Sequence, residues 1–165
     1  MMTRLSLICL FPIVLCLTVA GCGGEPRPDG LPELFPVTLT FTQEGEPCVE
    51  AIVTLIPESD SPWGTGGITD ANGRVAVRTH GKFLGAPAGR YRVTISKTES
   101  GVAGPAPADM FTVQTIQTFH LIDPTYADFA STPLIIEVEA NRRGNSFPPF
   151  ELGERVREPV RLPGM

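Results

Sequence analysis

The pattern that most limits the fold of this chain is an alternation of apolar and polar side chains between residues 36 and 152. Every second residue is apolar in Val37–Thr42, Tyr91–Ser96 and Leu134–Glu139. This period of two predicts strands with one buried face and one solvated face. Ala51–Ile56 is apolar on both sides apart from one threonine, so we place this strand in the centre of a sheet. No segment shows a convincing helical period.

Shorter segments complete the predicted sheet. Val75 and Val77 mark a short strand, and Phe111–Leu121 predicts one strand or two. Phe147–Leu152 predicts a last strand at a sheet edge, because the two prolines within it cannot donate ladder hydrogen bonds. The chain is therefore expected to form an all-β domain, a single antiparallel β-sandwich of about seven strands. Turn sequences separate these strands at Glu44–Pro47, Asp70–Arg74 and Arg142–Asn145.

Composition excludes several classes of protein. The 165 residues include 17 glycines and 17 prolines, which interrupt helices and argue against a helical bundle. A mean hydropathy of +0.09 is too high for a disordered chain. The net charge of −5 argues against nucleic acid as a partner, because phosphate binding needs a basic surface.

The first residues have the features of a secretory signal. Arg4 is followed by the predominantly apolar segment Leu5–Ala20, which has 16 residues. A membrane-spanning helix needs about 20 such residues, and Pro12 would kink this one. Small residues at the end of the segment fit cleavage by a signal peptidase.

The residues at the cleavage position resemble the lipobox of bacterial lipoproteins. They are Val19–Cys22, with the sequence Val-Ala-Gly-Cys. The resemblance implies cleavage after Gly21, acyl chains such as palmitate on Cys22, and attachment to a membrane. Gly23 favours an outer membrane, facing the periplasm or the exterior, because an aspartate there would favour inner-membrane retention. An ordinary signal peptide with a chance cysteine is the alternative.

These observations predict four regions along the chain. Residues 1–21 form the signal peptide, residues 22–35 a flexible tether, residues 36–152 the sandwich and residues 153–165 a disordered tail. Once the signal is removed and Cys22 carries lipid, Cys48 is the one remaining cysteine, so no intramolecular disulfide is expected. No basic residue lies beside Cys48 in sequence, and we expect it to be a small buried or half-buried apolar residue.

Three blocks of the sandwich region look like the carboxypeptidase regulatory-like domain, a transthyretin-like sandwich with an Ig-like arrangement. The resemblance covers about residues 36–97 and implies this fold, an accessory role and no shared catalytic residues. Cys48 departs from the family's usual small aliphatic residue. The three blocks are Val37–Leu55, Gly67–Arg74 and Ala86–Ile95.

The continuation of the chain is similar to small bacterial lipoproteins built around this domain. Those proteins carry a Pro-x-Tyr element, a Ser/Thr-Pro-Leu strand and a closing Asn-x-Phe strand. Pro148 and Pro149 interrupt the last strand here, and we expect them to fray the edge. The matching residues are Pro124–Tyr126, Ser131–Leu134 and Asn145–Phe147.

The chain has few of the residue patterns that are typical of enzymes with a related fold. Two histidines and two tyrosines bind iron in the related intradiol dioxygenases, but those ligands are tightly spaced. The histidines here lie 40 positions apart, and transthyretin-like hydroxyisourate hydrolases end in Tyr-Arg-Gly-Ser, unlike Leu162–Met165. We therefore expect no enzyme activity and no cofactor. The four residues that would form such an iron site are His80, His120, Tyr91 and Tyr126.

Acidic residues give no strong calcium motif. Asp70-x-Asn72-Gly73 resembles half of an EF-hand loop, but the twelfth position of that loop is Gly81 where a glutamate is needed. The segment is better explained as a turn, and we expect no metal site. A looser calcium site would use Glu99, Asp123 and Asp128.

Loops supply the candidate binding residues. Trp63 is the only tryptophan and lies in a glycine-rich loop, where it would either stack on a partner or cap the sandwich. Tyr126 and Phe129 lie in a second long loop and would either recognise a partner or hold the loop in place. The sequence predicts a lipid-anchored, non-catalytic binding or assembly module of the cell envelope, with an envelope protein or glycan as partner. The alternatives are a purely structural envelope component and, less favoured, a metal-dependent enzyme of a related sandwich fold.

Overall fold

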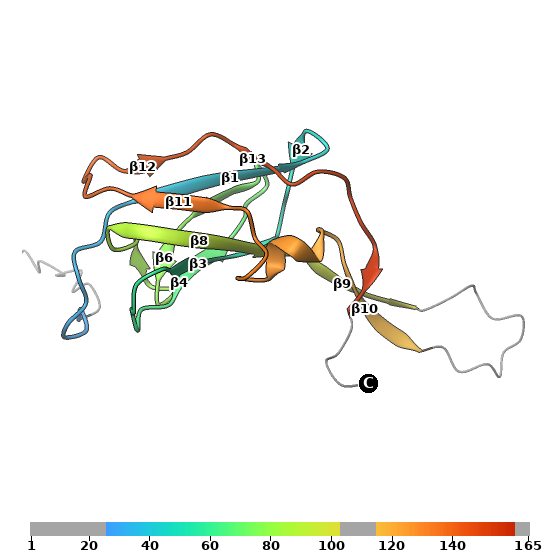
Figure 1. The fold of residues 1–165 in the computed structure, drawn as a ribbon, viewed down its shortest axis with the longest axis horizontal. Coiled ribbons are helices and arrows are strands. Elements are labelled where there is room, and N and C mark those ends of the chain that lie inside the picture. Colours follow the sequence, from blue (N-terminus) through green and yellow to red (C-terminus); the bar gives the residue numbers. More distant parts are fainter. Residues whose placement is uncertain (1–25, 103–114, 161–165) are drawn as a thin grey trace, which may run out of the picture. The chain divides into compact units, whose positions relative to one another are not determined.

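A computed structural model describes residues 26–102 and 115–160 (Figure 1). Met1–Gly30 and Leu31–Met165 form two compact units, and the second contains every strand described below. The predicted signal peptide, Gly21 and Cys22 lie outside the described residues. In the part of the chain that is described, no helix is long and apolar enough to cross a membrane.

The largest sheet has six strands, and every pairing in it is antiparallel (Figure 1). The strand order is β11-β8-β3-β4-β6-β7. The predicted central position of the apolar strand is confirmed, because β3 pairs with β8 on one side and β4 on the other. These strands are β3 (Ile52–Pro57), β4 (Thr65–Ile68), β6 (Arg78–Thr79), β7 (Phe83–Leu84), β8 (Gly89–Ser96) and β11 (Ile135–Val138).

A second sheet surrounds β1 (Val37–Gln43), which pairs with four short strands. Two of these pairings are antiparallel, with β2 and β5, and two are parallel, with β12 and β13. The prediction of a wholly antiparallel sandwich is therefore wrong at this edge. The last edge segment runs parallel to β1. Its two prolines lie between β12 and β13, where no ladder hydrogen bond is made. The partners are β2 (Glu46–Pro47), β5 (Arg74–Ala76), β12 (Asn145–Ser146) and β13 (Phe150–Glu151).

The hydrophobic core combines the inner faces of these two sheets, which gives the all-β unit its sandwich character. The predicted alternation is confirmed for β1, β8 and β11, whose inward side chains are buried. The outer face of β3 differs from the prediction, because Ile52 is 57 % exposed and no layer of described residues covers it. The buried set from these strands includes Val37, Leu39, Phe41, Val53, Leu55, Tyr91, Val93, Ile95, Ile136 and Val138.

The short strand predicted around Val75 and Val77 divides between the two sheets. β5 pairs with β1, and β6 pairs with β4 in the other sheet. The chain crosses at Val77, which is fully buried and donates its backbone N–H to the Val37 carbonyl. One edge of the sandwich is closed by this crossing, which alternation alone does not reveal.

The predicted tether ends earlier than expected. Phe35 is buried and exchanges two backbone hydrogen bonds with Ala86, of 2.8 and 3.0 Å. Glu33 forms an ion pair with Arg142, with an Oε1–Nη2 distance of 2.7 Å. Residues 33–35 therefore belong to the folded unit, because an apolar side chain of this size is stabilised by burial.

The predicted disordered tail also differs from the structure. β14 (Glu158–Pro159) pairs with β10 (Ile116–His120), which pairs in turn with β9 (Thr98–Val102), to form a third sheet. Val160 donates its N–H to the Thr118 carbonyl at 2.8 Å. Residues 153–160 are thus part of the fold, and residues 161–165 lie outside the described part, as do residues 111–114 of the predicted strand Phe111–Leu121.

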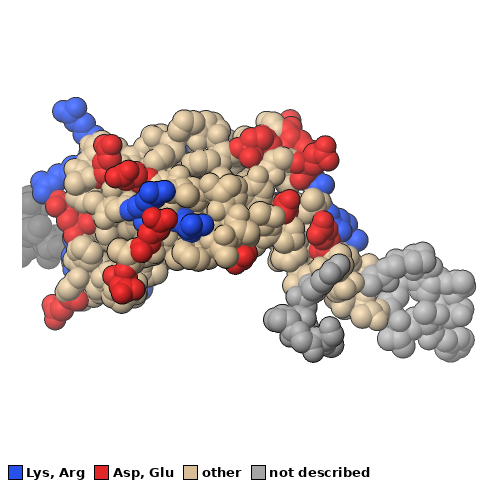
Figure 2. All heavy atoms as spheres, viewed as in Figure 1, with Lys and Arg blue, Asp and Glu red and all other residues tan. Residues whose placement is uncertain are grey.

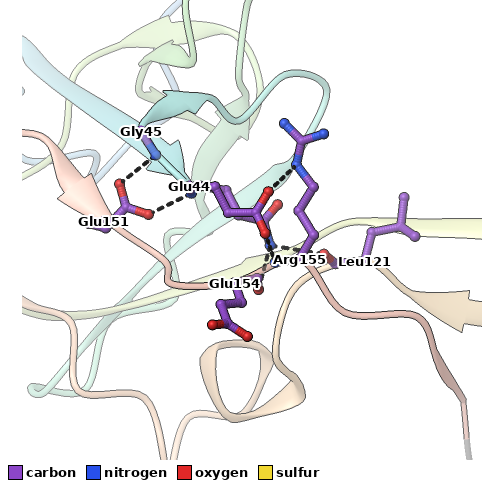
Figure 3. Close-up of polar contacts among 7 residues, drawn as sticks. Glu44, Gly45, Leu121, Glu151, Glu154 and Arg155 are labelled. Atoms are coloured by element: carbon purple, nitrogen blue, oxygen red, sulfur yellow. Dashed lines mark hydrogen bonds and ion pairs between the residues drawn. The ribbon is translucent and has the colours of Figure 1, made fainter.

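Polar side chains attach this C-terminal segment to the end of β1 (Figure 3). Gln43 is 6 % exposed, and its Nε2 donates to the carbonyls of Leu121 and Glu154, at 3.0 and 3.2 Å. Glu151 accepts hydrogen bonds from the backbone N–H groups of Glu44 and Gly45, at 2.8 and 3.3 Å. The turn between β1 and β2 is therefore capped by a residue more than 100 positions away.

Candidate functional site

The clearest candidate site is a pocket of about 480 Å³ that includes Trp63, which we call the Trp63 pocket. Phe35 and Tyr91 contribute buried aromatic side chains to it. Four prolines also line it, and their fixed φ angles make the surrounding backbone stiff. A volume of this size is within the range of small-molecule pockets, about 300–1,000 Å³.

The side chain of Trp63 is held by the neighbouring hairpin. His80 lies against it, with a ring-centroid distance of 5.1 Å and an interplanar angle of 60°. His80 and Gly81 form the turn between β6 and β7, and both have positive φ, at 54° and 69°. The backbone N–H of His80 also donates to the Gly64 carbonyl at 2.7 Å. The indole is thus positioned by the β6–β7 turn while remaining half-buried, so one part of it stays accessible.

Groups of both charge signs surround the Trp63 pocket. Arg90 lies in its wall and pairs with Glu58 through an Nε–Oε2 contact of 3.3 Å. Glu33 and Asp60 supply carboxylates, and two serines supply hydroxyl groups. The pocket therefore offers hydrogen-bond donors and acceptors beside an aromatic ring.

The other two candidate binding residues lie elsewhere. Tyr126 is in the 3₁₀ turn η1 (Pro124–Ala127) and is packed against the core, which favours a role in holding its loop. Phe129 is 42 % exposed, and the guanidinium of Arg92 lies 5.2 Å from its ring centroid. Neither residue lines the Trp63 pocket.

The histidines and tyrosines considered for an iron site are on separate elements. His120 lies in β10, opposite Glu158, whereas His80 lies beside Trp63. Tyr91 donates its hydroxyl to the Pro87 carbonyl at 2.8 Å, and burial raises the pKa of its phenol. Across the described ranges, no group of three His, Cys, Asp or Glu side chains is arranged to hold a metal ion.

The acidic residues considered for calcium instead form local caps and ion pairs. Asp70 accepts from the backbone N–H groups of Arg74 and Asn72, which lower the pKa of its carboxyl. The turn predicted for this segment is confirmed. Asp123 accepts from Thr125 as the N-cap of η1, and Asp128 accepts from Ser131 and Ala130, while Glu99 pairs with Arg157.

Cys48 is buried as predicted, but its surroundings are more basic than the sequence indicates. Burial raises the pKa of its thiol, while Lys97 and Arg155 act in the opposite direction. These cations are 49 and 107 positions away, counted as 97 − 48 and 155 − 48. Sequence reasoning missed them because only the folded chain brings β8's end and the C-terminal segment to the β2–β3 connection.

Exposed apolar side chains form a second surface feature, on the outer face of the six-stranded sheet. Ile52 and Ile68 are cross-strand partners, and their exposed fractions are 57 and 64 %. On the same face, Ile135 is paired with Arg92. Trp63 is not part of this face.

Comparisons with models of protein families, with curated proteins and with solved structures gave no significant match. Of the features above, the Trp63 pocket alone combines an accessible aromatic ring, stiff walls and polar groups of both signs.

Proposed function

We propose that this chain is a lipid-anchored, non-catalytic binding module of the bacterial cell envelope, and that its sandwich is of the carboxypeptidase regulatory-like, transthyretin-like kind. The ligand we favour is an envelope glycan, bound in the Trp63 pocket. The partly accessible indole of Trp63 carries this proposal, because aromatic faces pack on the apolar faces of sugar rings. The carboxylates, the guanidinium and the serine hydroxyls around the pocket suit the hydroxyl groups of a sugar.

A polypeptide partner is the second candidate, and a purely structural role is the third. Figure 2 displays acidic and basic side chains interspersed on one face, separated by wide uncharged areas. Such a face has no large electrostatic potential of one sign. The mixed charges therefore suit a partner that is recognised by shape and hydrogen bonding rather than by net charge. Nucleic acid is not favoured, because the chain carries a net charge of −5.

Anchoring rests on the sequence resemblance of Val19–Cys22 to a lipobox. Several acyl chains on one cysteine would hold the chain firmly, since stable attachment needs more than a single chain. The anchor would place the sandwich beside the envelope polymers that we propose as ligands. Outer-membrane attachment, facing the periplasm or the exterior, is favoured by Gly23.

The binding proposal is tested by the fluorescence of Trp63, which reports on the pocket without a label because the chain has one tryptophan. Soluble peptidoglycan fragments and neutral oligosaccharides are titrated into the full chain in a nonionic detergent. We expect a saturable change in emission. Isothermal titration of Trp63→Ala should show at least about tenfold weaker binding, while Phe129→Ala, a matched aromatic control outside the pocket, should bind as the wild type does.

Two outcomes would contradict the proposal. Absence of saturable binding by any of these glycans would remove the glycan ligand and favour a structural role or a polypeptide partner. Equal loss of affinity in Phe129→Ala and Trp63→Ala would show that the Trp63 pocket is not the specific site. The anchor is tested separately by the mass of the mature protein: the wild type should begin at Cys22 with acyl mass, and Cys22→Ala should lack it.

A further inference from the structure

We propose that a second pocket, around Cys48, binds a small organic carboxylate with an apolar chain. This pocket has a volume of about 300 Å³, at the lower end of the range for small-molecule sites. It shares no lining residue with the Trp63 pocket, so the two proposals stand independently. We call it the Cys48 pocket, and its lining residues are Gln43, Pro47, Cys48, Val49, Lys97, Leu121, Arg155, Val156 and Arg157.

Apolar groups form most of the surface of the Cys48 pocket. Val49, Leu121 and Val156 contribute aliphatic side chains from three separate segments. The thiol of Cys48 is buried and its pKa is raised by that burial, so it remains neutral at physiological pH. A neutral thiol behaves as a small apolar surface and is suited to an alkyl chain.

Three cations line the same pocket, and none of its described lining residues is acidic. These are Lys97, Arg155 and Arg157, in a chain whose net charge is −5. Glu44 and Glu99 pair with Arg155 and Arg157 from outside the lining, and the Cys48 thiol is uncharged, so the pocket wall itself carries no anion. A carboxylate is the ligand group that arginine and lysine bind by charge-assisted hydrogen bonds.

The three cations are held in place before any ligand arrives. Lys97 donates from Nζ to the Val49 carbonyl at 2.7 Å. The guanidinium of Arg157 lies 3.7 Å from the centroid of the Phe119 ring, and its Nε contacts Glu99 at 2.8 Å. Arg155 contacts Glu44 through Nε at 3.4 Å (Figure 3). These contacts restrict the three side chains in the free protein and so reduce the entropy lost on binding.

The arginine ion pairs use Nε, which leaves each guanidinium able to donate through its terminal nitrogens. Lys97 likewise has three N–H donors, and the Val49 carbonyl accepts from one of them. The pocket thus combines an apolar cavity with arginine and lysine N–H groups that are still able to donate. Inorganic phosphate would satisfy the donors alone, whereas an alkyl carboxylate would use both features.

The test uses hexanoate, which is short enough to remain monomeric in solution, with the full chain in a nonionic detergent. Saturation-transfer NMR measures its binding, and hexylammonium and hexanol serve as ligands with the same chain and a different head group. We expect hexanoate to bind saturably and the other two to bind at least about tenfold more weakly. Inorganic phosphate at the same concentration should not displace it.

Variants locate the site. Lys97→Gln and Arg157→Gln should each weaken hexanoate binding about tenfold, whereas Arg143→Gln, a matched loss of charge in the turn before β12, should leave it within about twofold. Cys48→Met fills part of the cavity and keeps all three cations, so it should also weaken binding. Thermal unfolding of each variant verifies folding, and Arg155→Gln replaces any variant that fails to fold.

Several results would overturn the proposal. Equal binding of hexylammonium or hexanol would show that the cations do not select the ligand. Displacement by phosphate at the same concentration would show that the apolar chain adds no affinity to that of the anionic group. Unchanged affinity in Lys97→Gln and Arg157→Gln would place hexanoate elsewhere on the chain.

Discussion

Replacement of Gln43 tests how the C-terminal segment is attached to the sandwich. Its side chain is 6 % exposed, and its amide nitrogen is the donor for two carbonyls, those of Leu121 and Glu154. Gln43→Met has a similar length and no donor, so it removes two hydrogen bonds without opening a large cavity. Each such bond contributes about 0.5–1.5 kcal/mol, and the expected loss in the free energy of unfolding is about 2 kcal/mol.

Urea unfolding followed by the fluorescence of Trp63 measures this loss. With a slope of about 2 kcal/mol per molar urea, the midpoint should fall by about 1 M. Gln117→Met is the matched control, because the Gln117 side chain makes no hydrogen bond to any residue in the described ranges, and it should change stability by less than about 0.5 kcal/mol. Gln43→Glu should cost more than Gln43→Met, because its carboxylate faces two carbonyl oxygens.

Hydrogen exchange supplies a local readout of the same change. The amide of Val160 donates to Thr118 in the β10–β14 pairing, and its protection should fall in Gln43→Met. A stability loss below about 0.5 kcal/mol with unchanged protection at Val160 would refute the role assigned to Gln43. In that case the ion pairs of Arg155 and Arg157 would be the main attachment.

Three further perturbations address the core, a turn and an acid-sensitive cap. Leu39→Ala, at a fully buried position, should lower the free energy of unfolding by about 2–5 kcal/mol in urea titration; a loss under 1 kcal/mol would contradict its placement in the core. Gly73→Ala should lower the melting temperature, because Gly73 has a φ of 69° and an added Cβ would meet the Phe41 carbonyl; an unchanged temperature would contradict that turn geometry. The Thr42 hydroxyl and backbone N–H groups lower the pKa of Glu151 in the folded chain. The stability that this carboxylate contributes is therefore present above the pKa that Glu151 has in the unfolded chain, and it is lost as pH falls through the pKa that Glu151 has in the folded chain. Glu151→Gln should reduce the difference in melting temperature between pH 7 and pH 3. An unaltered difference would contradict the cap.

The strands were largely predictable, because period-two alternation is a local property. The inward sides of β1, β8 and β11 are the apolar residues that alternation selects, and the turn at Asp70 follows from its own Asx hydrogen bonds. The site was predictable only in part. Trp63 lines a pocket, yet the contact of His80 with its ring depends on a left-handed turn that brings β6 and β7 together.

Other features depended on contacts between distant segments. The third sheet includes a C-terminal segment that has no apolar period; Arg157 lies on the Phe119 ring, and Gln43 donates to the carbonyls of Leu121 and Glu154 beside this sheet. The basic Cys48 pocket likewise combines residues that are up to 114 positions apart, from Gln43 to Arg157 (157 − 43). Neither charge nor hydropathy along the chain encodes such proximity.

Sequence alone determined the all-β class, the inward faces of the main strands and the turns between them. It did so because side-chain alternation and the backbone limits of glycine and proline act over a few residues. Tertiary structure decided which strands pair in parallel, where the chain crosses between sheets at Val77, and which side chains share a pocket. Those outcomes depend on the packing of two sheets against one core, where each contact is set by segments far apart in the chain.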